Sequence, residues 1–318
     1  MAKRILTVMI ISALILIGLE FASKFIFIRY CVGESDCEAE ASILYIGDSQ
    51  GVELAPRVRS KLKPKYNVIS SCENGLAPDA YLARLSLLDD YYKPDLIMIS
   101  ICATNDISDL RLMVEKPLQE KIKLYLGRHS YFYNVLKTVY FNAITRCRLG
   151  KRHFTVAGNQ VILVDSDGKI KPIDTETNET SSDFISEDLL LKSRLMQDSW
   201  NMFERLAKEM SDIAKRRGVP LIFICLPDPI QVDERYKSMY VDSGFEVPED
   251  FVNKPVIQDR LNTMCVKNGI IVIDLLLYLQ SKDDHDLFYE NNPHFNDRGA
   301  EIVSDYVINV LRRSDVIK

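Results

Sequence analysis

The chain has 318 residues, 47% of them hydrophobic and 27% charged, so it is long enough for one large or two small globular domains. Its formal net charge is −5, and acidic and basic residues are interspersed along the sequence. No lysine and arginine cluster outside the N-terminus resembles the footprint of a nucleic-acid-binding surface, which argues against a nucleic acid as partner.

The first thirty residues differ from the rest. Lys3 and Arg4 precede an apolar run without charged residues at 5–19, and a second apolar patch follows at 25–28. Together they approach the thickness of a bilayer, and the basic residues ahead of them keep the N-terminus in the cytoplasm. We therefore expect a single-pass signal anchor that exports the body, and a cleaved signal peptide with a secreted body is the alternative. The predicted parts are an anchor at 1–30, a stem at 31–41 and a domain at 42–318.

The cysteines number seven, so at least one thiol is free or pairs between chains. Cys102 and Cys225 lie in apolar runs and Cys72 follows one, as small buried side chains do. Cys31 and Cys37 flank the stem, where we expect a local disulfide. No Cys-x-x-Cys or histidine-rich spacing indicates a metal, and no cofactor is expected.

Strands and helices alternate after the stem. Apolar runs predict strands at 42–46, 67–70 and 96–102, and periodicity predicts helices at 51–62 and 79–91, the second capped by Asp79. Near-continuous apolar strands that alternate with helices are typical of a parallel sheet covered on both faces.

Residues 107–183 break this alternation. They contain helical pieces at 119–126 and 131–141, a hairpin of 161–164 with 169–173, and a polar stretch at 174–183. We interpret the segment as an insertion near the edge of the sheet, either a lid or a surface decoration.

The alternation then resumes. The predicted elements are a helix at 187–217 ended by Gly218, a strand at 220–226, a helix at 256–268, a strand at 270–273 and a helix at 299–311. The domain thus has five parallel strands.

The tripeptide Gly47-Asp48-Ser49 follows the first predicted strand. A buried strand that ends in a small-residue turn presents the next side chain at the carboxyl edge of the sheet, where open α/β folds bind ligands. A serine there is a candidate nucleophile if a base and an oxyanion hole meet it. The alternative role for Ser49 is that of a helix N-cap.

His294 is the candidate base. It is predicted to lie in a loop after the last strand, from which it can reach across the sheet edge toward Ser49. Of the other histidines, His129 and His153 fall in the insertion and His285 lies in an acidic surface run.

The candidate oxyanion hole consists of three donors at strand ends. Gly75 offers an unobstructed backbone N–H, Asn105 a side-chain amide, and Ser49 its own N–H. Ester chemistry needs two or three such donors converging on one oxygen. Taken singly, Gly75 and Asn105 are ordinary turn residues.

These residues resemble, in order, the conserved blocks of the SGNH (GDSL-type) hydrolase superfamily. The matching positions are Gly47-Asp48-Ser49, Gly75, Asn105-Asp106 and His294, over roughly residues 42–312. The resemblance implies a flavodoxin-like three-layer α/β/α fold and ester hydrolysis or acyl transfer without a metal. The layout also resembles exported members that acetylate or deacetylate polysaccharides, which implies an acyl ester of a cell-surface glycan or lipid as substrate.

Two positions depart from the family pattern. Ala103 replaces a glycine ahead of Asn105, and the acid expected two or three residues before the histidine is absent. An amide in that place can orient an imidazole but cannot stabilise an imidazolium as a carboxylate does. The candidates for the third member of the site are Asn291, Asn292, Glu290, Asp286 and a main-chain carbonyl.

The sequence therefore predicts a serine esterase, with an O-acyltransferase as the alternative because both share the first half-reaction. The rival from another class is a catalytically degenerate protein of the same fold that binds a glycan or acts as a scaffold. A nucleotide-binding flavodoxin-like protein is disfavoured, because Gln50-Gly51-Val52-Glu53 has one glycine and an acid where a phosphate would lie.

Overall fold

A computed structural model of the chain describes residues 2–31, 39–103, 105–115, 117–136, 153–157, 160–164, 170–171, 190–242, 247, 254–282, 286–290 and 292–317. For residues 2–10, for 153–171 where described, and for some helical positions, it describes the backbone alone. Two compact units are formed, one by residues 1–32 and 125–178 and the other by 33–124 and 179–318. The domain boundaries at residues 30 and 41 stay predictions.

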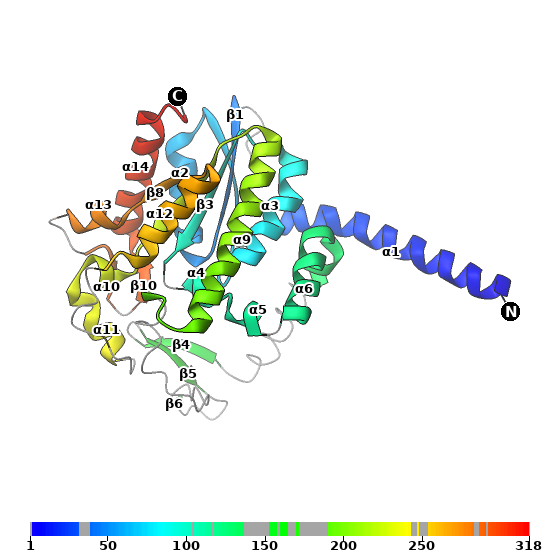
Figure 1. The fold of residues 1–318 in the computed structure, drawn as a ribbon, viewed down its shortest axis with the longest axis horizontal. Coiled ribbons are helices and arrows are strands. Elements are labelled where there is room, and N and C mark those ends of the chain that lie inside the picture. Colours follow the sequence, from blue (N-terminus) through cyan, green and yellow to red (C-terminus); the bar gives the residue numbers. More distant parts are fainter. Residues whose placement is uncertain are drawn as a thin grey trace. The chain divides into compact units, whose positions relative to one another are not determined.

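The larger unit is built on a five-stranded parallel sheet with the order β2-β1-β3-β7-β8. Its strands are β1 (Ala41–Gly47), β2 (Tyr66–Cys72), β3 (Leu96–Cys102), β7 (Leu221–Leu226) and β8 (Ile271–Asp274). Counted within this sheet, the order is 2-1-3-4-5, that of flavodoxin-like doubly wound folds. The predicted fold class and all five strands are confirmed (Figure 1).

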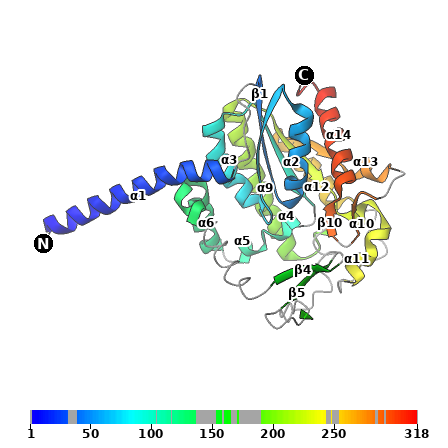
Figure 2. The ribbon, with the colours of Figure 1, turned by 180° about the vertical axis from the view of Figure 1, so that it is seen from behind.

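Helices cover both faces of the sheet. The long ones are α2 (Ser49–Leu62), α3 (Pro78–Tyr92), α9 (Arg194–Arg217), α12 (Val256–Asn268) and α14 (Asp297–Arg313). The helix α2 lies beside α14, and α9 lies beside α3 and α12 (Figures 1 and 2). The shorter helices are α4 (Asn105–Ser108), α5 (Arg111–Glu115), α10 (Pro229–Val232), η2 (Glu234–Tyr236), α11 (Lys237–Asp242) and α13 (Leu276–Gln280).

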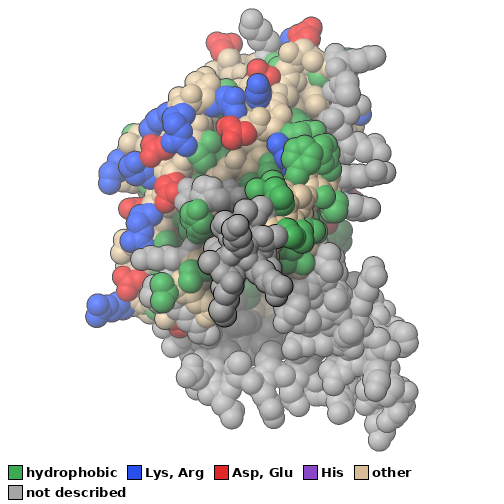
Figure 3. Space-filling model, turned by 90° about the vertical axis from the view of Figure 1, so that its right-hand side faces the viewer, with side chains coloured by type: hydrophobic (Ala, Val, Ile, Leu, Met, Phe, Trp, Pro, Cys, Tyr) green, Lys and Arg blue, Asp and Glu red, His purple; other side chains and the backbone are tan. Residues whose placement is uncertain are grey.

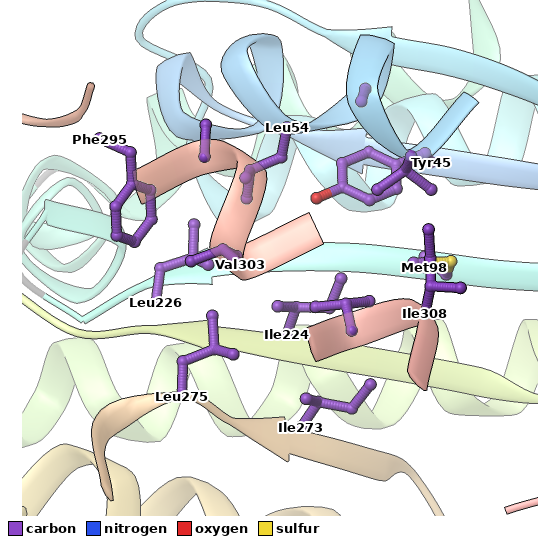
Figure 4. Close-up of a cluster of buried hydrophobic side chains, with 14 of the residues drawn as sticks. Tyr45, Leu54, Met98, Ile224, Leu226, Ile273, Leu275, Phe295, Val303 and Ile308 are labelled. Atoms are coloured by element: carbon purple, nitrogen blue, oxygen red, sulfur yellow. The ribbon is translucent and has the colours of Figure 1, made fainter. Parts of the chain in front are cut away.

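The core under α2 and α14 follows the two-residue period of the strands. Tyr45, Met98, Ile224 and Ile273 come from four neighbouring strands and point to the same side, where they meet Leu54, Val303 and Ile308 (Figure 4). The alternate residues are buried on the opposite face, where the ring centroids of Phe223 and of Phe203 in α9 lie 6.3 Å apart. Because both faces are covered, the strands read as continuous apolar runs.

The smaller unit contains α1 (Ala2–Cys31) and an antiparallel sheet of β4 (His153–Ala157), β5 (Gln160–Val164) and β6 (Ile170–Lys171). The predicted hairpin corresponds to β5 and β6, while β4 was not foreseen. Within this unit, Glu20 accepts hydrogen bonds from Ser130 Oγ at 2.7 Å and Phe132 N at 3.2 Å, at the start of the helical residues 131–136. The helix α6 comprises Pro117–His129.

Within the described part of the chain, no helix combines the length and the apolar character that crossing a membrane requires. The exposed large apolar side chains of α1 are Ile11, Leu14, Ile15, Leu16, Ile17, Leu19, Phe21, Phe25 and Ile26.

Basic and acidic side chains lie interspersed on the coloured part of the face in Figure 3, in line with the pattern of the sequence.

Three local predictions were wrong. Asp79 does not cap α3, which begins at Pro78 after Ala77, because a proline at the first helical position needs no donor partner. The helix α9 begins at Arg194 and not at 187, since Ser193 caps it by accepting from Met196 N at 3.2 Å. His294 lies in a short strand and not in a loop: β10 (Asn292–Phe295) pairs with β9 (Phe288–Tyr289).

The three cysteines predicted to be small buried side chains all lie in the described part of the chain. Cys102 and Cys225 are buried, as expected, Cys72 is half-buried, and none of the three forms a disulfide. Cys37 lies outside the described residues, so its pairing with Cys31 stays a prediction.

Candidate active site

The turn between β1 and α2 is built from close backbone packing. A Cβ atom on Gly47 would lie 2.2 Å from Ser100 Oγ and 3.1 Å from Gly51 Cα, and one on Gly51 would lie 3.0 Å from Cys72 Sγ. Only glycine fits at both places without displacing a neighbour. The chain can therefore turn directly from the sheet into α2, whose first residue is Ser49.

Ser49 and His294 are 245 residues apart in the sequence but lie in contact. The distance between Ser49 Oγ and His294 Nε2 is 2.7 Å. On the other side of the ring, His294 Nδ1 is in a short contact with Asn292 Oδ1, and both residues belong to β10. Serine, imidazole and amide thus form a continuous hydrogen-bonded row.

The contacts of Asn292 determine the tautomer of this histidine. Its Oδ1 also accepts the backbone N–H of His294 at 3.1 Å, and a backbone N–H can only donate. The amide atom that faces Nδ1 is therefore the oxygen, so Nδ1 carries the proton. His294 Nε2 is left with a lone pair toward the Ser49 hydroxyl, which is the arrangement of a general base.

Asp48 connects this turn to the third strand. It is 1% exposed and caps α2, where its Oδ1 accepts from Gln50 N at 3.0 Å and Gly51 N at 3.4 Å. Its Oδ2 accepts from Asn105 Nδ2 at 3.4 Å. Burial raises the pKa of Asp48, and the bonds from Asn105, Gly51 and Gln50 oppose that rise, as does the attraction of His294.

The two other residues of the predicted oxyanion hole lie at the same edge of the sheet. Gly75 is exposed, has φ +74°, and belongs to a loop whose Glu73 N donates to Gly47 O at 3.2 Å. Asn105 begins α4 directly after β3 and uses one amide hydrogen on Asp48, which leaves a second hydrogen on Nδ2. Asn105 Oδ1 is buried and has no hydrogen-bond partner among the described residues.

A buried tyrosine joins these two loops. The Tyr81 hydroxyl lies 2.7 Å from Asp106 Oδ1 and 3.3 Å from Leu76 O, which directly follows Gly75. Asp106 is fully buried, and its Oδ2 accepts from Cys102 N at 2.8 Å. Burial raises the pKa of Asp106 well above its usual value, and the Asp48 carboxylate raises it further.

The other candidates for the third member lie elsewhere. Asp286 Oδ1 accepts from Asn296 Nδ2 at 3.1 Å, in the cap of α14. Glu290 is exposed, and Asn291 lies outside the described residues.

No group of His, Cys, Asp and Glu in the described part of the chain has an arrangement that could hold a metal.

The structure describes two of the remaining histidines, and for these only the backbone. His129 ends α6 and His153 begins β4, and His285 lies outside the described residues. Sequence reasoning missed the neighbours that hold the site, Gln50 and Tyr81. Neither stands in a motif, so no signal in one sequence points to them.

The sequence matches no protein-family model and no curated protein. Solved structures similar to the chain include TesA, with a TM-score of 0.43, 10% identity and coverage of 87% of this chain and 99% of that one. The psychrotrophic esterase EstA from Pseudoalteromonas sp. has a TM-score of 0.42 and 9% identity, over 86% and 98% of the two chains. The acetyl xylan esterase AlAXEase has a TM-score of 0.42 and 11% identity, over 85% and 99%. Similarity at this level does not carry a function over to this chain.

Proposed function

We propose that the protein is a serine esterase in which Ser49 is the nucleophile and His294 the general base. The observation that supports this most strongly is the 2.7 Å contact between Ser49 Oγ and His294 Nε2, with Asn292 Oδ1 on the opposite ring nitrogen. A serine is a weak nucleophile until an adjacent base takes its proton.

The proposed reaction begins when Ser49 Oγ attacks the carbonyl carbon of the ester and His294 Nε2 takes the hydroxyl proton. The oxyanion that forms accepts hydrogen bonds from the N–H groups of Ser49 and Gly75 and from the Asn105 amide. The Ser49 N–H is available for this because the first N–H groups of a helix have no partner within it. The imidazolium then protonates the departing alcohol, and water activated by the same histidine releases the acyl group.

The charge of this site differs from that of a site with a carboxylate behind the histidine. Asn292 orients the ring but carries no charge to stabilise the imidazolium. Asp48 is a buried carboxylate whose pKa is raised by burial and lowered by the charge on His294, so the two groups attract each other. We propose that Asp48 supplies part of the stabilisation that Asn292 does not.

For the substrate, we propose an O-acyl ester, O-acetyl in the first instance, on a cell-surface carbohydrate or lipid. The support is the location predicted from the sequence, in which Lys3 and Arg4 precede a run without charges. We propose that α1 associates with the membrane through this run, and that the enzyme acts outside the cytoplasm. The exposed apolar side chains of Leu14, Leu16 and Phe21 in α1 could contact lipid in this arrangement.

The proposal is tested by hydrolysis of para-nitrophenyl acetate and butyrate by the full chain, beside Ser49→Ala and His294→Ala. Ser86→Ala is the matched control, because this serine bonds Leu82 O within a helix. We expect turnover in the wild type and the control, and a loss of about three orders of magnitude or more in the two site variants.

Absence of turnover in the wild type, together with absence of fluorophosphonate labelling at Ser49, would reject the esterase and favour a binding protein. Labelling without turnover would instead indicate an acyl acceptor other than water, as in an O-acyltransferase.

A further inference from the structure

Gln50, the residue after the proposed nucleophile, bonds to both neighbours of the proposed base. Its Nε2 donates to Pro293 O at 2.7 Å, and its Oε1 accepts from Phe295 N at 3.2 Å. The side chain is 4% exposed, so both bonds are made out of water. One amide therefore bonds to the backbone immediately before and immediately after His294, as a neighbouring strand would.

The pairing of β10 explains why such a partner is needed. The two strands of the hairpin pair through Asn292 with Tyr289 and through Phe295 with Phe288, and the register shifts between these pairs. His294 lies inside that irregularity, where a regular ladder does not fix the backbone. The Gln50 amide bonds at this point.

The other connections between the two halves of the site are weaker. Arg57 with Asp297 and Lys61 with Asp305 join α2 to α14 at 2.5 and 2.6 Å, but their carboxylates are exposed. Exposed ion pairs contribute little and are screened by salt. Asn292, which holds the ring itself, is also exposed. Gln50 thus makes the buried polar connection between the nucleophile turn and the base strand.

We propose that Gln50 is a positioning residue that sets the backbone of His294 relative to Ser49. The role rests on the proposed function, in which these two side chains react. Because Ser49 and Gln50 are consecutive in the first turn of α2, any displacement of that turn moves the nucleophile and the support of the base together. The 2.7 Å contact between Ser49 and His294 is then maintained without a carboxylate on the histidine.

The test replaces Gln50 by Met, which keeps the length of the side chain and removes both hydrogen bonds. Gln258→Met is the matched control, because Gln258 is 1% exposed and its amide makes two bonds with Gln231. Two readouts are compared, the kinetics on para-nitrophenyl acetate and the ¹⁵N spectrum of the His294 ring, assigned with His294→Ala.

We expect Gln50→Met to lower kcat by about 10- to 100-fold with KM unchanged, because a small misplacement of a catalytic group costs that much. The ring should change from a single Nδ1-protonated form to a mixture of tautomers. Gln258→Met should lose a similar amount of thermal stability and keep both kcat and the spectrum. If Gln50→Met does not fold, Gln50→Asn keeps a neutral amide but is one methylene shorter, so it cannot make both hydrogen bonds, and the same changes are expected.

A Gln50 variant with wild-type kcat and a single ring tautomer would overturn the proposal, and so would equal losses of activity in Gln50→Met and Gln258→Met. The spectrum does not depend on turnover. If the wild type is inactive, the proposed function fails, while the tautomer comparison still decides whether Gln50 positions His294.

Discussion

The two halves of the candidate site are held in different ways. The nucleophile half lies in the core of the sheet, where the buried Asp48 caps α2 and Gly47 packs against Ser100. The base half is a short irregular hairpin, where the neutral side chains of Asn292 and Gln50 hold His294.

The difference separates two tasks that a carboxylate behind the histidine would perform together. Neutral amides fix the tautomer and direction of an imidazole, since they donate and accept in defined geometry. They do not offset the positive charge that appears on the ring when it takes the proton of Ser49. We therefore expect a carboxylate introduced on the base half to raise the rate through charge, and the loss of a neutral amide there to lower it through geometry.

Beyond the Ser49 and His294 variants, the largest effect is expected at Asn105. Asn105→Ala removes the proposed side-chain donor to the oxyanion, and one such donor contributes about 10²- to 10³-fold to kcat. The measurement is kcat and KM on para-nitrophenyl acetate, with KM changing much less than kcat. A loss of less than about fivefold would remove Asn105 from the oxyanion hole.

The second largest effect is expected for Asn292→Asp, which gives the base half the charge that it lacks. We expect kcat to rise by about tenfold or more, in the direction opposite to the loss found when an acid in this role becomes an amide. The acid limb of the pH profile should move to higher pH, since a carboxylate favours the protonated ring. Asn292→Ala, which removes the bond to Nδ1, should lower kcat. An unchanged kcat in Asn292→Asp would contradict the assigned role of Asn292.

A third prediction concerns stability on the nucleophile half. Burial raises the pKa of Asp106 well above its usual value of 3.8, so the folded state keeps a proton that the unfolded state has lost. The free energy of unfolding should therefore fall as the pH rises from 3.8 through the folded-state pKa.

In Asp106→Asn this contribution is absent, and its amide can still pair with Cys102 N and the Tyr81 hydroxyl. The variant should gain stability relative to the wild type between about pH 5 and 8, measured by urea denaturation. Asp212→Asn is the control, because Lys208 lowers the pKa of this exposed carboxylate. Any stability that Asp212 contributes is therefore lost as the pH falls, in the direction opposite to that expected for Asp106. A difference between Asp106→Asn and wild type that stays constant with pH would show that Asp106 is charged in the folded state.

The smallest effect is expected for Tyr81→Phe. The change removes the hydroxyl between Asp106 and Leu76 and should cost about 1 kcal/mol of stability, the net value of a typical hydrogen bond. It should lower kcat only a few-fold, because Gly75 and Asn105 keep their own backbone positions. Thermal unfolding and kinetics on the same samples measure both, and a loss as large as that of Asn105→Ala would mean that the loops depend on Tyr81.

The fold could be read from the sequence because apolar runs such as 96–102 are buried on both faces and are followed by small or polar turn residues. The contact between Ser49 and His294 was predicted from Ser49 at a strand end and His294 after the last strand of the sheet, although His294 lies in a strand and not in the loop expected. The β9–β10 hairpin was missed because Phe288–Tyr289 is too short for a periodic signal. The roles of Gln50 and Tyr81 come from contacts across the fold, which a single sequence does not encode in a local pattern.

Whether His294 activates Ser49 can be decided by labelling the full chain with a fluorophosphonate and locating the modified residue by mass spectrometry. We expect a single adduct on Ser49 in the wild type and in Ser86→Ala, and labelling slowed by orders of magnitude in His294→Ala. An unlabelled Ser49, or one labelled equally fast without His294, would contradict this activation.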